Sequence, residues 1–276
     1  SGNDDDKSEA FSLIKSMGYK IVPLDINHAT KGWTYIPDKQ FMPSLCSIDG
    51  LGETAADEIM SSRPYKTFED ILWDENGEWK PSKFNKRSLE SLIKIGAFNS
   101  LNCVGPDKLF SSYAHMYHVV IECNQEIRKS TKKDPFKGKN EFYRLVRETR
   151  DTVQEWTRRE FAMHQLDVFG SVDVNNLIEP EIMEIFDAKG IKPVDRFEEQ
   201  NVYWFCVLKS IPKKTKTNKQ YMQLEVQGSN GKIMKMFCWG VKPGDQAIED
   251  YSICFADVTK SDFGYATQRY KLRILE

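Results

Sequence analysis

The pattern of apolar and polar positions divides the chain into two regions with different periodicity. Between residues 106 and 130, and again after the linker KSTKKDPFKGKN, apolar side chains recur about every 3.6 residues, as in amphipathic helices. Pro106 and Asp107 supply a start signal for the first of these helices. From Val202 onward, short segments rich in Tyr, Phe, Val and Ile alternate with turn signals. The pattern predicts a mostly helical region followed by a β region.

The β region divides into five predicted strands. They are Val202–Ile211, Gln220–Gly228, Lys232–Trp239, Ser252–Lys260 and Gln268–Leu275. A Ser-Asn-Gly turn joins the second strand to the third, and a connector at 242–250 follows the third. Five short strands with this connector are typical of a small OB-type barrel. In the last strand we expect Tyr270, Leu272 and Ile274 in the core, and Arg269, Lys271 and Arg273 as a basic stripe.

Composition narrows the classes of function. The chain has 276 residues, of which 40% are apolar, enough for two domains. Its net charge is −2, so binding to nucleic acid must come from local patches. The six cysteines form no C-x-x-C pair, and His115, His118 and Cys123 lack a fourth ligand, so no metal site is predicted. No apolar run is long enough for a membrane span, and scattered thiols favour a cytoplasmic location.

The sharpest local motif is a tight turn between two short helical segments. It consists of Ile48, Asp49, Gly50, Leu51, Gly52, Glu53 and Thr54. We expect the two glycines to permit a hairpin that a Cβ would block, and Leu51 to lock the helices together. The free N–H groups at the start of the second helix then form a site for a DNA phosphate. The alternative is an ordinary helix corner with a glycine C-cap, and the acidic Glu53 argues mildly for it.

A weaker copy of this motif follows at Leu92–Phe98. It has the single glycine Gly96, beside Lys94. Lys83, Lys86 and Arg87 lie upstream and can supply positive charge, although charge runs are usually solvated helix faces. Two such hairpins can grip two phosphates of one duplex, which predicts contacts to the DNA backbone and not to the bases.

The order of these motifs resembles that in a known protein family. GYKIVPLDIN (18–27), IDGLGETAADEIM (48–60), RPYKTFEDI (63–71) and NKRSLESLIKIGAFNSL (85–101) are similar to the alpha subunit of bacterial DNA polymerase III. The resemblance implies the end of a fingers region, a tandem helix–hairpin–helix domain and an OB-fold domain. Family catalysis uses palm carboxylates with Mg²⁺, which lie upstream of the matched segment, so we expect a non-catalytic fragment of a polymerase with no catalytic residue. Family hairpins often hold a monovalent cation through main-chain carbonyls. The family's L-G-x-Y-L-S-G-H-P element is not intact, which fits a divergent, phage-like member.

The predicted fold class is therefore α+β and multidomain. Residues 1–40 form a lead-in and the end of the fingers-like segment, 41–160 the tandem helix–hairpin–helix domain, 161–200 a linker, and 201–276 the OB-fold domain. The expected partners are duplex and primer–template DNA, with single-stranded DNA on the barrel, in a bacterial or phage-infected cell.

A peptide between the two predicted domains resembles the motif by which bacterial replication proteins dock on the sliding clamp. Its residues are Gln165, Leu166, Asp167, Val168 and Phe169. In this interpretation the apolar side chains anchor in a pocket and Gln165 fixes the register. Two alternatives are open: the residues are the inward-packing end of a helix, or a degenerate form of the family element near Gly170.

The predicted barrel carries a candidate single-strand site. The loop after the first strand, predicted at 212–219, contains Lys213, Lys214, Lys216 and Lys219. Strand alternation places Met222, Leu224 and Val226 on one face and Tyr221 on the other, and it places Lys235 on a face with Phe237 and Trp239. The three rings can stack bases, or they can instead fill the barrel core.

Two other classes of function compete with a DNA-binding polymerase region. A repair glycosylase with a hairpin needs a catalytic Asp soon after it, and Asp70 lies at a comparable distance. A ligase needs K-x-D-G, which the sequence lacks. A replisome protein-interaction module would be indifferent to bulky substitutions at Gly50 and Gly52.

Overall fold

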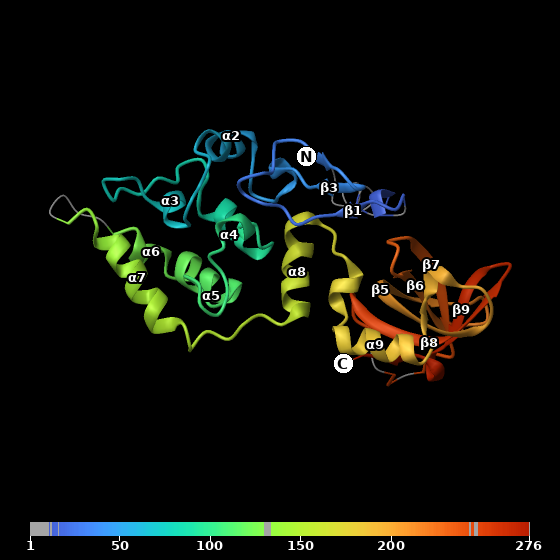
Figure 1. Ribbon diagram of the computed structural model, residues 1–276. Coiled ribbons are helices and arrows are strands. Elements are labelled where there is room, and N and C mark those ends of the chain that lie inside the picture. The colour runs from blue at the N-terminus through green and yellow to red at the C-terminus, as the bar shows by residue number, and fades with distance from the viewer. Residues whose placement is uncertain are drawn as a thin grey trace. The chain divides into compact units, whose positions relative to one another are not determined.

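The computed structural model describes residues 11–275 apart from 12, 16, 130–133, 243, 246 and 247. The chain divides into two compact units, one of residues 19–171 and one built on residues from Val172 onward (Figure 1). Residues 19–40, predicted as part of a lead-in, thus belong to the helical unit, and most of the predicted linker belongs with the barrel. Residues 1–10 of the lead-in lie outside the described residues.

The helical unit opens with a small sheet in the order β1-β3-β2. Its strands are β1 (Lys20–Ile21), β2 (Thr34–Ile36) and β3 (Gln40–Met42). A 3₁₀ turn and three helices follow, with a second 3₁₀ turn after them. In chain order these are Leu45–Ser47, α2 (Glu53–Ser61), α3 (Glu69–Leu72), α4 (Lys86–Lys94) and Asn99–Leu101.

The predicted long helix at 106–130 is shorter and interrupted. It consists of α5 (Tyr113–Tyr117), a π turn (His118–Glu122) and α6 (Asn124–Ile127). Its start signal is Ser112, whose side chain accepts a hydrogen bond from the His115 N–H, so the predicted start at Pro106 is wrong. Two longer helices complete the unit, α7 (Lys137–Thr149) and α8 (Arg158–Phe169). A capping box of Thr157 and Glu160 begins α8.

An aromatic cluster forms the centre of the helical unit. Phe68 lies edge-to-face against Phe98 and Phe110, with ring centroids 5.3 and 5.1 Å apart. Phe110 in turn lies 5.8 Å from Phe142 of α7. All four side chains are fully buried. Because each such pair contributes about 0.5–1.5 kcal/mol beyond its area burial, the cluster ties α3 and α4 to α7.

The second unit contains a closed five-stranded barrel of the OB type. Its strands are β5 (Asn201–Lys214), β6 (Gln220–Gln227), β7 (Ile233–Trp239), β8 (Ser252–Ser261) and β9 (Gly264–Gln268). Antiparallel pairs join β5 to β6, β6 to β7, β9 to β8 and β8 back to β5, while β7 and β9 pair in parallel. This cycle closes the sheet on itself, as the five predicted strands indicated.

One set of alternate residues on each strand fills the barrel interior, and on β6 it includes Leu224 and Val226 of the face that the sequence grouped with Met222. Leu224, Val226, Met236 and Cys238 are fully buried there. Outside, Phe186 of α9 (Pro180–Ala188) covers Trp204 of β5, with ring centroids 6.4 Å apart. Two short strands extend the sheet, β4 (Lys192–Pro193) beside β5 and β10 (Arg273–Ile274) beside β8.

The fifth predicted strand is wrong in position. The barrel strand is β9, which follows β8 after a turn of two residues, whereas residues 269–271 form a 3₁₀ turn. Leu272 is buried as expected, but Tyr270 is 68% exposed and not in the core. Lys271 is paired with Asp257 at 2.6 Å, and an Arg273 N–H donates to the Tyr270 carbonyl, so the predicted basic stripe is not continuous.

Candidate nucleic-acid interface

The first hairpin is a surface turn on a buried apolar base. Ile48 and Leu51 are buried, and the Leu51 N–H donates to the Ile48 carbonyl at 3.2 Å. Gly50 has φ +77°, and a Cβ there would lie 2.7 Å from Cγ of Arg87, so glycine is required by conformation and by space. Gly52 differs from the prediction, because its φ is −83° and nothing lies within 4 Å of a Cβ.

Four backbone donors of this hairpin point to no acceptor of the described chain. They are the N–H groups of Gly50, Gly52, Glu53 and Thr54. Gly52 caps α2 without a side-chain hydrogen bond, and the residues from Gly52 to Thr54 are exposed. The N-terminal end of a helix carries a partial positive charge, so this arrangement can bind an anionic oxygen. The Asp49 N–H is not among these donors, because it donates to the Val168 carbonyl at 3.2 Å.

Two serines of helix α4 hydrogen-bond to the backbone of the hairpin. The Ser88 hydroxyl donates to the Gly50 carbonyl at 2.7 Å, and the Ser91 hydroxyl donates to the Asp49 carbonyl at 2.8 Å. The Asn85 side chain caps α4 by accepting from the N–H groups of Arg87 and Ser88. Neither serine was expected in the site from the sequence, although their three-residue spacing places them on one helix face.

Arg87 brings a positive charge to the first hairpin and not to the second. Its guanidinium donates to the Asp49 carboxylate at 2.8 Å, and this hydrogen bond raises the pKa of Arg87. The side chains of Arg87 and Asp49 are 69% and 59% exposed, so solvent weakens the pair and other anions can reach the guanidinium. Lys83 and Lys86 are exposed at the same end of α4.

Glu58 fixes α2 to the segment that precedes α4. Its carboxylate accepts the N–H groups of Ser82, Lys83 and Phe84, at 2.9, 2.6 and 3.1 Å. Hydrogen bonds to a charged acceptor are roughly twice as strong as neutral ones. This side chain therefore adds to the bonds that hold together the two helices of the hairpin site.

The predicted second phosphate site is wrong. Gly96 is buried with φ +72°, and its N–H donates to the Ile93 carbonyl at 3.1 Å. Tyr113 donates to the Gly96 carbonyl at 2.9 Å, and a Cβ on Gly96 would lie 3.1 Å from Phe161. Gly96 thus follows the C-cap residue Ile95 as the left-handed glycine that ends α4, and its N–H is not a free donor. Lys94, also assigned to this site, is paired with Glu90 at 3.0 Å.

The clamp-motif residues form the last turns of α8. Val168 and Phe169 are only 3% and 8% exposed, whereas Gln165 and Leu166 are half-buried and Asp167 is exposed. Gly170 ends the helix with φ +69°. A clamp peptide must present its apolar anchors to a partner, so the structure corresponds to the alternative of an inward-packing helix end and contradicts the clamp interpretation in this conformation. The capping box at Thr157 and the glycine at 170 were the sequence signals for this helix.

The outer face of the barrel gathers the three predicted rings. Tyr221 pairs in register with Trp239, with ring centroids 4.7 Å apart, and Phe237 stacks on Trp239 at 6.0 Å. All three side chains are half-buried on the face opposite the core residues, so the alternative that they fill the core is excluded. We call Tyr221, Phe237 and Trp239 the aromatic row.

The lysines of the predicted site lie at two places around the aromatic row. Lys213 stands in register with Tyr221. Lys235 stands opposite Glu225, so the positive charge of Lys235 is partly offset by the carboxylate. Lys213 and Lys214 belong to β5 and not to the loop, which covers only residues 215–219 and contains Lys216 and Lys219. All of these lysines are exposed.

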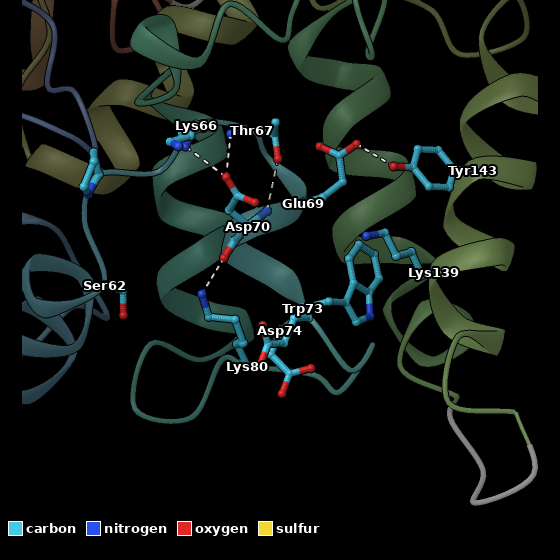
Figure 2. A pocket seen from close by; sticks show the side chains of 12 residues that line it. Ser62, Lys66, Thr67, Glu69, Asp70, Trp73, Asp74, Lys80, Lys139 and Tyr143 are labelled. Carbon is cyan, nitrogen blue, oxygen red and sulfur yellow. Dashed lines mark hydrogen bonds between the residues drawn. The ribbon is translucent and has the colours of Figure 1, made fainter.

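A pocket of about 760 Å³ lies elsewhere on the helical unit, beside α3 (Figure 2). Asp70, the candidate base of a repair enzyme, accepts the N–H groups of Lys66 and Thr67 at 3.0 and 2.8 Å. Burial raises the pKa of Asp70, but these hydrogen bonds outweigh burial and leave the pKa below its ordinary value. The neighbouring Glu69 accepts the hydroxyl of Tyr143 at 2.7 Å. These carboxylates are committed to helix capping and packing.

Neither a metal centre nor a membrane span appears in the part of the chain that the structure describes. No cluster of three or more His, Cys, Asp or Glu side chains there is arranged to hold an ion. None of its helices combines the length and apolarity needed to cross a bilayer. Burial and the nearby Arg150 charge lower the pKa of His115 to about 4, and its Nδ1 accepts the Ser111 N–H, so this histidine is a neutral core residue.

The fold and the hairpin together define a helix–hairpin–helix and OB-barrel protein. The family model of the helix-hairpin-helix motif matches residues 18–105. The chain is 34% identical to DNA polymerase III subunit alpha of Aquifex aeolicus over 98 residues, which cover 35% of this chain and 8% of that protein. It is 27% identical to the same subunit of Campylobacter jejuni over 190 residues, which cover 68% of this chain and 14% of that protein.

The chain is therefore a helix–hairpin–helix and OB-barrel region similar to one in DNA polymerase III subunit alpha, and it spans a small part of these relatives' length. Among solved structures it matches the second OB-fold domain of replication protein A from Methanococcus maripaludis. That match has a TM-score of 0.22 and 15% identity and covers 28% of this chain and 84% of the other.

Proposed function

We propose that this chain is a non-catalytic DNA-binding region of a replicative polymerase. It holds duplex DNA behind the growing end by contacts to phosphate, without regard to sequence. The observation that carries the proposal is the set of unengaged N–H groups at the start of α2 beside Arg87, which are those of Gly50, Gly52, Glu53 and Thr54. Main-chain donors recognise a phosphate oxygen and carry no information about the bases.

The electrostatics of the hairpin favour weak binding. Arg87, Lys83 and Lys86 attract a phosphate, while Asp49 and Glu53 lie on the same turn and repel it. Each phosphate contact that a cation makes releases counterions, so affinity falls with salt with a slope of about −0.9 per contact. With a net charge of −2, the whole chain has no general attraction for DNA, and this patch must supply the effect.

The barrel contributes a second contact, to unpaired bases. The aromatic row lies on strands β6 and β7, the face that OB barrels use for single strands. Stacking tolerates every base, because each base has a π face. Lys213 and the lysines of the 215–219 loop flank the row and are placed to accompany the backbone of a template strand.

Clamp docking is not part of the proposal, because Val168 and Phe169 are buried in α8. DNA synthesis itself is proposed only for the parent protein, in which Mg²⁺-binding carboxylates outside this chain would do the chemistry. The relatives are DNA polymerase III alpha subunits, which supports this assignment.

The experiment is a salt-titrated binding series with fluorescent duplex, primer–template and single-stranded DNA, from about 50 to 200 mM salt. The hairpin variant is Thr54→Glu, which places an acid among the exposed donors but suits a helix N-terminus, so the fold is retained. We expect it to weaken duplex binding and to reduce the salt slope.

Thr152→Glu is the matched control. It adds the same charge in the exposed α7–α8 connection, away from α2 (Figure 1). Equal losses in the two variants would mean that net charge, and not the hairpin, governs binding. No duplex binding by the unaltered chain at low salt would refute the proposal.

A further inference from the structure

The turn between β8 and β9 holds a large apolar side chain out in water. Phe263 is 88% exposed at the tip of this turn, and its N–H donates to the Ser261 hydroxyl at 3.3 Å. Its ring contacts no other aromatic ring of the described residues. Burial of apolar surface stabilises folded proteins, so a phenylalanine this exposed contributes almost nothing to packing. Its side chain is free to meet a ligand.

The turn lies at one end of the aromatic row. Gly264, the next residue, has φ +119°, and a Cβ there would stand 3.7 Å from Cε2 of Phe237. The register continues this neighbourhood, because Ala266 of β9 pairs with Phe237, and Gln268 pairs with Trp239. Along β7 the order is thus Trp239, Phe237 and then the turn that carries Phe263.

From this placement we infer that Phe263 is a fourth stacking ring, which extends the single-strand track of the barrel beyond Phe237. The inference rests on the proposed single-strand binding. It adds one contact residue and extends the path of the bound strand from Phe237 to the β8–β9 turn. A strand that stacks on Trp239 and Phe237 reaches the β8–β9 turn next, where the exposed ring meets the following base.

The charges around the turn favour a base at Phe263 and a backbone elsewhere. Asp262 in the turn itself opposes phosphate, and Lys235 beside the turn stands opposite Glu225, whereas Lys213, at the other end of the aromatic row, attracts phosphate. Lys260 lies over the Tyr265 ring at 5.5 Å, on the strand that leads into the turn. The other residues of the turn, Ser261, Asp262 and Gly264, are polar or lack a side chain, so Phe263 is its one apolar side chain.

The test uses the whole chain with fluorescent oligothymidylate and with a duplex. Phe263→Ala is expected to weaken binding to oligothymidylate roughly fivefold or more, the loss of one stacked base, and to leave duplex binding unchanged. Phe263→Trp is expected to keep the affinity, and its added tryptophan fluorescence is expected to fall when oligothymidylate binds. Ile185→Ala on α9, another exposed apolar side chain of the same unit, is the matched control and should change nothing.

The outcomes separate this inference from the function on which it depends. If the unaltered chain binds no oligothymidylate, single-strand binding by the barrel fails and the role of Phe263 fails with it. If Tyr221→Ala weakens binding and Phe263→Ala does not, the aromatic row stands and the fourth ring is refuted. If Phe263→Ala changes only the self-association of the chain, the residue is a protein contact and the inference is wrong.

Discussion

The Asp49→Asn variant tests the hairpin most directly, because we expect it to bind duplex DNA more tightly. The Asp49 carboxylate holds the Arg87 guanidinium at 2.8 Å. Asparagine has nearly the same shape and keeps the backbone bonds of residue 49 to Val168 and to Ser91. It removes one negative charge from the site and releases one arginine for a phosphate. The fold should be unaffected, since both members of the pair are more than half exposed.

The magnitude follows from one added phosphate contact. Each contact changes the slope of log affinity against log salt by about −0.9, so the slope of the variant is steeper by that amount. Lowering salt from about 200 to 50 mM therefore strengthens its binding about 3.5-fold more than it strengthens binding by the unaltered chain. Asp187→Asn, an exposed acid at the end of α9, makes the same change of charge and should not alter the slope.

The assay is fluorescence anisotropy with one duplex across that salt range, for Asp49→Asn, Arg87→Ala and the double variant. Arg87→Ala alone should leave the slope of the unaltered chain nearly unchanged, because Asp49 already holds the arginine there, and Asp49→Asn should gain nothing in its background, because the added contact requires Arg87. An equal gain with and without Arg87 would show a general charge effect. Unchanged or weaker binding by Asp49→Asn would refute the assignment of Arg87 to a phosphate.

Three further predictions concern stability. Gly50→Ala should lower the free energy of unfolding by about 1–2 kcal/mol in urea titrations, whereas Gly52→Ala should cost well under that, since only Gly50 has a positive φ; equal losses would contradict the assigned geometry. Phe169→Ala should cost about 3 kcal/mol by the same measurement, and a neutral result would show that the end of α8 is not packed. His115, with its pKa near 4, favours its neutral form when folded, so stability should fall as pH drops from about 6.5 toward 4, and His115→Gln should flatten that pH profile of thermal unfolding.

The strands of the barrel were predictable because their two-residue period determines which side chains share a face. Counting in twos separated Tyr221 from Met222, Leu224 and Val226 and put Phe237 on one face with Trp239, but it left open which face forms the core. The closed sheet places the three rings outside. The last strand was misplaced because a two-residue turn at 262–263 starts β9 at once, and a glycine with φ +119° ends that turn. The alternation after residue 268 then suggested a longer strand than β10.

The two hairpins show that a local sequence pattern does not determine which turn is exposed. Gly50 and Gly96 lie in similar motifs at the end of a helical segment, but Tyr113 and Phe161 cover only Gly96. Those two rings come from helices far along the chain, and no window around Gly96 contains them. The position of Arg87 beside Gly50 depends in the same way on how α4 packs against the turn. Local sequence thus predicted the turns, and tertiary contacts decided which one is exposed.

The three hydrogen bonds of Glu58 have a consequence for the speed of recognition. Because that carboxylate already joins α2 to the 82–84 segment, the donors at the start of α2 keep their orientation before DNA arrives. A preorganised site loses little conformational entropy when it captures its ligand. In the proposed function, the chain would then release and recapture successive phosphates without refolding the hairpin.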